Sequence, residues 1–276
     1  MKKSLNAWSV ESTLDFEQTF RAVSEAGFEG IELNIDAPGR SAHSLSMETT
    51  QADYAFIQAL SQKYALPVVS ISTSLSAGMS GIPEKHESYR SLLRKQIEAA
   101  KAFGAGGILT SPGGMGSGIT LHSARQSTIT FFKAMKAEIE ASGVFVGLEN
   151  VWNGFFLSPY DMTSMFEEIN STSIGAYLDT GNMIAFSTSE YWVEVLGKWI
   201  GYVHVKDFLR NSHINSGGTW VDITHGSADW RAIIPALRQA GFNGYLTGEV
   251  FKSDDSMSYS DYYNKVSSEI GEIITY

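Results

Sequence analysis

One short pattern recurs three times along the chain and marks the passage from a helix into a strand. It reads AGFEGIEL at 26–33, FGAGGILT at 103–110 and AGFNGYLT at 240–247. Its first glycine, which is Gly27, Gly104 or Gly241, stands where the end of a helix favours a residue that can adopt positive φ. The β-prone residues after the second glycine begin a strand. The pattern therefore predicts that helices alternate with strands.

This joint locates eight strands along the chain. We predict them near 5–10, 30–35, 67–73, 106–111, 144–150, 174–180, 201–206 and 244–250. Helical stretches fill the intervals, as in DFEQTFRAVSEAG, where Phe16, Phe20 and Val23 fall on one face. Strands that alternate with helices, and that are too continuously apolar for an open antiparallel sheet, favour a parallel sheet covered by helices.

Eight such units close into a (β/α)8 barrel, or TIM barrel, an α/β fold that commonly takes about 250 residues. The 276 residues, 43% of them apolar, are enough for one large core, and no compositional break suggests a linker. We therefore predict a single domain over residues 1–276. An open doubly wound sheet is the structural alternative, but the Gly-rich phosphate-binding fingerprint expected after its first strand is missing.

The composition excludes several classes of function. A formal net charge of -10 disfavours a nucleic-acid partner, because such affinity comes mainly from Lys and Arg on phosphates. The absence of cysteine excludes disulfides, thiolate ligands and cysteine nucleophiles, and it agrees with a reducing compartment. The N-terminal segment is too polar for a secretory signal, and no stretch approaches the roughly 18 apolar residues of a membrane span. We expect a cytoplasmic protein with no membrane partner.

Four predicted strands in the second half of the chain end in a carboxylate or an imidazole. These groups are Glu149 in VFVGLEN, Asp179 in IGAYLDTGN, His204 in YVHVKDF and Glu249 in YLTGEV. The strands of a (β/α)8 barrel all end at its catalytic face, so the four groups should meet there. This mostly oxygen ligand set suits manganese, magnesium or cobalt at least as well as zinc, and a divalent cation would relieve repulsion among the acids. The alternative is that the acids cap the helices that follow.

Side-chain alternation extends this prediction, because every second residue of a strand faces the same side. If His204 points into the barrel, Lys206 joins it at the mouth and Asp207 faces away. Gly147 and Gly175 lie below two of the acids on the inward face. We expect these glycines to leave the barrel interior open, as a ligand pocket requires.

Two long glycine-rich loops follow predicted strand ends, SPGGMGSGIT at 111–120 and NSHINSGGTWVDITHGS at 211–227. Their position puts them at the mouth, where glycine would permit closure over a ligand, although their composition also fits ordinary surface loops. The histidines outside the cluster carry less information. We expect surface positions for His43, His86 and His122. His213 and His225 lie in the second loop and could reach the mouth, but a lone loop histidine is usually solvated.

Five segments in this order, LENVWNGFFLSP, YLDTGN, HVKDFLR, HGSADW and TGEV, resemble the xylose isomerase-like barrel superfamily over the whole chain. The resemblance is closest to its sugar-phosphate isomerase/epimerase branch, which includes ketose 3-epimerases and pentulose-5-phosphate 3-epimerases. It implies that the metal ligands are the four groups Glu149, Asp179, His204 and Glu249. It also implies a substrate contact from Arg210, six residues after the histidine.

The sequence departs from that superfamily's other branches at informative positions. The residue three after the metal aspartate is often histidine in the ketose-epimerase and endonuclease branches, whereas here it is Asn182, which can still hydrogen-bond a sugar hydroxyl. The segments SISTS and LTSPG supply none of the further histidines of the DNA-repair endonucleases. A trinuclear zinc cluster therefore lacks ligands, which argues against an abasic-site nuclease.

The resemblance implies a divalent-metal-dependent isomerase or epimerase that acts through an enediolate on a ketose or ketose phosphate. We expect one ion, foremost Mn²⁺ with Mg²⁺, Co²⁺ or Zn²⁺ as alternatives, and proton exchange by Glu149 and Glu249 from opposite faces. An inosose-type dehydratase and a catalytically silent sugar-binding barrel are the alternatives. A homo-oligomer is also possible.

Several other residues are candidates for contacts with such a substrate. We expect Asn182, Lys206 and Arg210 to bind the sugar. Trp8, at the end of the first strand, and Trp152 and Phe155, after Glu149, could stack on its apolar face, whereas Trp230 should pack. Candidate phosphate-binding residues are Ser72, Ser111 and the loop GGMGSG at 113–118.

Overall fold

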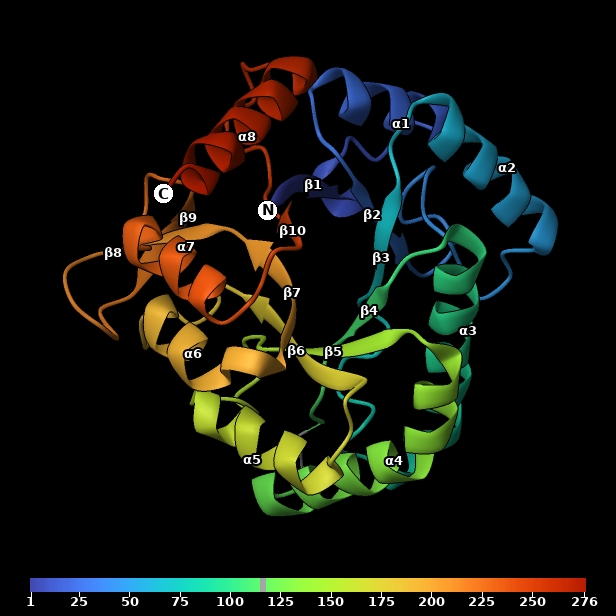
Figure 1. The fold of residues 1–276 in the computed structure, drawn as a ribbon, viewed down its shortest axis with the longest axis vertical. Coiled ribbons are helices and arrows are strands. Elements are labelled where there is room, and N and C mark those ends of the chain that lie inside the picture. Colours follow the sequence, from blue (N-terminus) through green and yellow to red (C-terminus); the bar gives the residue numbers. More distant parts are fainter. Residues whose placement is uncertain (115–117) are drawn as a thin grey trace.

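The computed structural model describes residues 1–114 and 118–276, and within them eight parallel strands close into one barrel. Helices form an outer ring around these strands (Figure 1). The strand order is β1-β10-β7-β6-β5-β4-β3-β2, and β1 pairs with both β10 and β2. This confirms the predicted (β/α)8 architecture and excludes the open doubly wound sheet.

The elements follow the predicted alternation. The barrel strands are β1 (Lys2–Asn6), β2 (Ile31–Ile35), β3 (Val68–Thr73), β4 (Gly107–Thr110), β5 (Phe145–Glu149), β6 (Ile174–Asp179), β7 (Ile200–Val205) and β10 (Tyr245–Gly248). The helices are α1 (Phe16–Glu25), α2 (Gln51–Lys63), α3 (His86–Phe103), α4 (Leu121–Ser142), α5 (Pro159–Ile169), α6 (Ser189–Leu196), α7 (Trp230–Gln239) and α8 (Tyr259–Ile274). The described residues also form three short 3₁₀ turns, η1 (Ala7–Ser9), η2 (Pro83–Lys85) and η3 (Gly197–Trp199).

The helix boundaries have local chemical causes. Asp15, Thr50, Thr120 and Ser158 form capping boxes at the starts of α1, α2, α4 and α5. At the three repeated joints, Gly27, Gly104 and Gly241 adopt φ of 78°, 70° and 86°. Only glycine takes this conformation without strain, which is why the recurring pattern marked these helix ends correctly.

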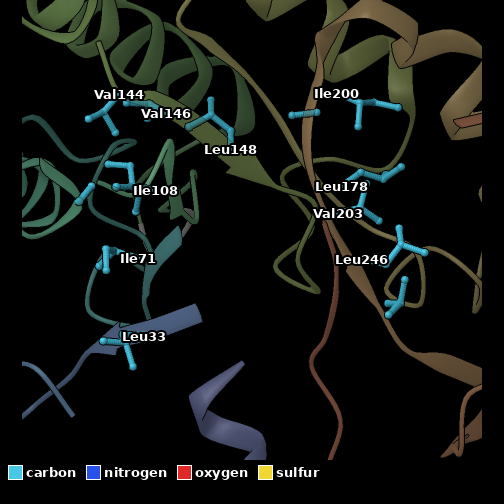
Figure 2. Close-up of a cluster of buried hydrophobic side chains, with 14 of the residues drawn as sticks. Leu33, Ile71, Ile108, Val144, Val146, Leu148, Leu178, Ile200, Val203 and Leu246 are labelled. Atoms are coloured by element: carbon cyan, nitrogen blue, oxygen red, sulfur yellow. The ribbon is translucent and has the colours of Figure 1, made fainter. Parts of the chain in front are cut away.

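The apolar core lies between the barrel and its helices rather than inside the barrel. Outward residues of successive strands are fully buried, among them Leu33, Ile71, Ile108, Leu178 and Leu246. Figure 2 shows these side chains arranged in a ring around the barrel. Burial of this layer provides the main driving force for folding, at roughly 25 cal/mol per Å² of apolar surface.

The barrel interior is polar instead. Inward positions hold buried side chains that hydrogen-bond one another, namely Asn6, Glu32, Asn34, Ser70, Ser72, Tyr177 and His204. The expectation of open space below the acids was wrong. A Cβ on Gly147 would lie 2.7 Å from the Tyr177 Cβ, and one on Gly175 would lie 2.8 Å from the Phe145 ring. These glycines make room for aromatic rings.

The loop after β7 is not simply irregular. It folds into an antiparallel hairpin of β8 (Asp207–Arg210) and β9 (Gly218–Val221), which the sequence did not reveal. Of the loop at 111–120, Met115, Gly116 and Ser117 lie outside the described residues, so half of the predicted GGMGSG phosphate-binding segment cannot be placed. Within the described part of the chain, no helix combines the length and apolarity that a membrane span needs.

Two of the histidines expected at the surface are not there. His43 is 1% exposed, and its ring nitrogens hydrogen-bond Leu14 O at 2.8 Å and Ala7 O at 3.0 Å. His86 is half-buried and bonds Ser80 O. Exposed positions are found for the others, His122, His213 and His225. Distant backbone carbonyls keep the His43 ring inside, whereas the His86 ring is held by the nearby Ser80 carbonyl and by the hydroxyl of Ser127 on α4.

Candidate metal centre and its cavity

The four predicted ligands come together at the carboxyl ends of adjacent strands. Glu149 ends β5, Asp179 ends β6, His204 lies near the end of β7, and Glu249 directly follows β10. Strand register aligns Asp179 with His204 and His204 with Thr247. One donor atom from each of the four residues lies within 4.8 Å of all the others.

The cluster is centred on the His204 Nδ1 atom. This nitrogen lies 3.7 Å from Glu149 Oε1, 3.6 Å from Glu249 Oε2 and 4.0 Å from Asp179 Oδ2. All four residues are buried, and in the described structure His204 Nδ1 has no hydrogen-bond partner, while Asp179 Oδ2 has only an ion pair with Lys206 at 2.9 Å. Buried polar atoms are rarely left without partners, so the arrangement fits a divalent cation that both would coordinate.

A residue missed by the sequence reasoning holds the other side of this imidazole. Glu32, in the middle of β2, is fully buried, and its Oε1 lies 2.6 Å from His204 Nε2. Because an ionised carboxylate can only accept, we assign the Nε2 proton to His204, which directs Nδ1 toward the acids. The available signal was a lone acid in the apolar strand IELNI, at a position that alternation turns inward.

Lys206 reaches the same cluster, as alternation predicted. Its Nζ donates a hydrogen bond to Glu249 Oε2 and lies 2.9 Å from Asp179 Oδ2, although it is not aligned for a hydrogen bond there. The ammonium also lies 5.3 Å from the centre of the Trp220 ring. Asp207 faces away, where it accepts a hydrogen bond from Trp230 Nε1, and that tryptophan packs as predicted.

The pKa values of the cluster residues reflect an excess of negative charge. Burial raises the pKa of Glu149 to about 7, and the charge of Glu249 adds to this effect while His204 opposes it. Burial also acts to raise the pKa of Glu249, but Lys206 and His204 outweigh it and hold that pKa below its ordinary value. Burial disfavours the imidazolium, yet Glu32 keeps the pKa of His204 well above its usual range. Protons on Glu149 and His204 thus provide charge balance that a divalent ion would supply in their place.

A cavity of about 420 Å³ opens onto this cluster. Its wall includes Glu149, Glu249, Lys206, Asn182 and Trp8. The backbone N–H of Asn182 donates to Asp179 Oδ1 at 2.8 Å, and its side-chain Nδ2 lies 3.5 Å from Glu149 Oε1. The side chain of Asn182 therefore lies at the boundary between the cluster and the cavity.

Aromatic side chains line the same cavity. Trp8 lies in η1 rather than in β1, and its Nε1 donates to Asp36 Oδ2 at 3.0 Å. Trp152 also lines the cavity and is 54% exposed. Phe155, in contrast, is buried and packs against Phe156 at a ring distance of 4.9 Å.

Three further predicted substrate contacts have different positions. Arg210, on β8, does not line this cavity in the described residues, and its Nη1 donates to Ile184 O at 3.3 Å and Ser187 O at 3.2 Å. It braces the loop after β6. Ser72 is buried in the barrel interior, where Asn34 Nδ2 donates to its Oγ. Ser111 does line the cavity.

Comparisons with solved structures agree on the fold. The chain is similar to 3-keto-D-glucoside 4-epimerase from E. coli, with 18% identity, 100% of both chains covered and a TM-score of 0.77. It is also similar to a zinc-bound IolI protein, with 15% identity, 100% of this chain and 98% of that one covered and a TM-score of 0.82. A third relative is D-allulose 3-epimerase from Methylomonas sp. in complex with D-allulose, with 18% identity, 100% and 96% covered and a TM-score of 0.72.

At these identities the similarity establishes the fold alone. No curated protein matches the chain by sequence. The family model described as xylose isomerase-like TIM barrel, however, matches residues 20–265, which span α1 to α8 and all four residues of the cluster. The chain therefore belongs to the xylose isomerase-like TIM-barrel family.

Proposed function

We propose that this protein is a divalent-metal-dependent sugar isomerase, and specifically an epimerase that inverts a carbon next to the carbonyl of a ketose. The observation that carries the proposal is the buried donor set, in which three carboxylates face an imidazole nitrogen that has no partner among the described residues. The sugar substrates named for two structural relatives, and the D-allulose bound to one of them, support a small sugar as the ligand.

The proposed ligands of the ion are Glu149, Asp179, Glu249 and Nδ1 of His204. When bound, the ion would polarise the carbonyl and stabilise the negative charge that develops on the ketose oxygens. Three oxygen donors to one nitrogen donor favour Mn²⁺ over Zn²⁺, with Mg²⁺ or Co²⁺ also suited. The zinc in one structural relative supports a divalent ion in general.

The protein residues would carry out the proton transfers. Glu149 and Glu249 project from β5 and from the end of β10, which are separated by β6 and β7 in the barrel. One carboxylate would remove the proton from one face of the ketose carbon, and the other would return a proton to the opposite face.

Other cavity residues would position the sugar. Asn182 Nδ2 is available at the edge of the cluster for a hydroxyl, and the Lys206 ammonium lies beside Glu249. Trp8 and Trp152 offer aromatic faces to the apolar side of the ring. Arg210 would act only through the loop it braces, since its guanidinium is already bonded to backbone carbonyls.

The test is incubation of ketoses with metal-depleted and metal-reloaded protein in D2O. An epimerase leaves deuterium on the inverted carbon, whereas a dehydratase releases water instead. Glu149→Gln and Glu249→Gln should each lower kcat by about 10²–10⁴ while sugar binding persists. A barrel that binds ketoses but produces no deuterium exchange, or that keeps full activity in both variants, would contradict the proposal.

A further inference from the structure

A second cavity, of about 340 Å³, lies beside the proposed catalytic site. Lys206 and Glu249 line both cavities. The other walls come from the β8–β9 hairpin, the segment at 250–253 after β10, and α8. The two cavities therefore adjoin at the Lys206–Glu249 pair.

An aromatic wall and a buried hydroxyl characterise this second cavity. Trp220 is 44% exposed, yet its ring is fixed by Trp152 at 5.1 Å and Phe208 at 5.2 Å. Tyr262, from α8, is only 3% exposed, and its Oη has no hydrogen-bond partner in the described residues. A hydroxyl that is desolvated without a partner is costly, and a polar group of a ligand would satisfy it.

The charges in this wall disfavour an anionic ligand. Asp222 and Glu269 both line the cavity, and a carboxylate oxygen of each lies within 4.8 Å of the other. The lining lysines are engaged elsewhere, since Lys206 bonds Glu249 and Lys252 Nζ donates to Asp254 O at 2.7 Å. Asp222 is already paired with Lys265, which lies outside the lining, so a phosphate here would lie beside the Glu269 carboxyl group with no available cation among the described lining residues.

The hydroxyl groups of a sugar ligand would form favourable hydrogen bonds with the same wall. They donate to carboxylates, they accept from the Tyr262 O–H, and the carbon face of a pyranose ring stacks on an indole such as Trp220. We propose that the second cavity binds a neutral, hydroxylated ring attached to the reacting ketose. The preferred substrate would then be a glycosylated ketose rather than a free monosaccharide or a sugar phosphate, an inference that rests on the proposed function only for the placement of the ketose.

Calorimetry on Mn²⁺-supplemented protein tests this with four probes: D-fructose, D-fructose 6-phosphate, and the glucosyl-fructoses isomaltulose and maltulose, linked through O6 and O4. We expect at least one glucosyl-fructose to bind about tenfold or more tightly than fructose, and the phosphate to bind no better than fructose. Equal affinity for fructose and both glucosyl-fructoses, or tighter binding of the phosphate, would overturn the inference.

Two variants test whether the tighter binding of glucosyl-fructoses arises in this cavity. Tyr262→Phe and Glu269→Gln should each weaken glucosyl-fructose binding about tenfold, roughly the loss of one hydrogen bond, and leave fructose binding unchanged. The control Tyr160→Phe, at a residue 68% exposed on α5, should change neither. Because the Tyr262 Oη has no partner in the described structure, Tyr262→Phe should fold with an unchanged or higher Tm. Unaltered glucosyl-fructose affinity in folded Tyr262→Phe would place the second ring elsewhere.

Turnover of the same probes separates this inference from the proposed function. Tight glucosyl-fructose binding that depends on Tyr262, without deuterium exchange in D2O, would support the second-ring site and contradict the epimerase function. Epimerisation of fructose with no preference for a glucosyl-fructose would support the epimerase function and contradict the second-ring site.

Discussion

Replacement of Glu32 by glutamine isolates the contribution of the residue behind the proposed metal centre. The Glu32 carboxylate is fully buried and accepts hydrogen bonds from four donors: Asn6 Nδ2, Ser70 Oγ, Tyr177 Oη and His204 Nε2. Glu32→Gln keeps the volume but replaces one acceptor oxygen by an NH₂ group, which must then face donors. His204 loses a charged partner 2.6 Å from its Nε2 atom, so its ring becomes less basic and less firmly oriented.

These contacts set the expected losses of metal affinity and of stability in Glu32→Gln. Loss of a partner to a metal-bound histidine typically lowers metal affinity 10–100-fold, or about 1.4–2.7 kcal/mol. Amide and donor groups left mismatched in a buried network should also lower the free energy of unfolding by about 1–3 kcal/mol. Metal affinity and stability should therefore both fall, whereas the cavity wall remains intact because Glu32 does not line it.

Titration with Mn²⁺, followed by the electron paramagnetic resonance signal of the free ion, measures the affinity directly. Glu25→Gln, which makes the same change at an exposed position on α1, should match the parent protein. Denaturant unfolding gives the stability of each variant. If Glu32→Gln is folded and binds Mn²⁺ within twofold of the parent, Glu32 does not orient the metal ligand and the reasoning is refuted.

Two further predictions concern the region around the β8–β9 hairpin. Burial raises the pKa of Glu269 to about 7, with Asp222 adding and Lys265 opposing, and Glu272 and Asp207 are the other acids that contribute. Between about pH 4.5 and 7 the folded chain holds the Glu269 proton more tightly than the unfolded chain, so the free energy of unfolding should fall as pH rises. Glu269→Gln should flatten the plot of this free energy against pH over that range. An unchanged slope in the variant would contradict the raised pKa. Asp207→Asn should lower the free energy of unfolding by about 2–3 kcal/mol with metal affinity unchanged, because its carboxylate accepts from the N–H groups of Phe208, Gly226 and Ala228 and from Trp230 Nε1. A loss of metal affinity would contradict its placement away from the metal centre.

The sequence by itself determined the elements and their order. Gly27, Gly104 and Gly241 end helices because only glycine adopts positive φ cheaply, and capping residues such as Asp15 begin them. These signals act over a few residues and can be read without knowing the fold. The identity of the four cluster residues was also accessible, because parallel strands all present their last residues at the same end of the barrel.

Only the tertiary structure decided what lies behind and beside those residues. Glu32 meets His204 across 172 positions of sequence, and β1 closes the barrel between β2 and β10. Gly147 admits the side chain of Tyr177 rather than a ligand, and Arg210 is held by the loop after β6. Alternation along a strand tells which face a side chain takes, but not which distant side chain fills the space in front of it. That depends on barrel closure, which brings strands from both ends of the chain around one polar interior.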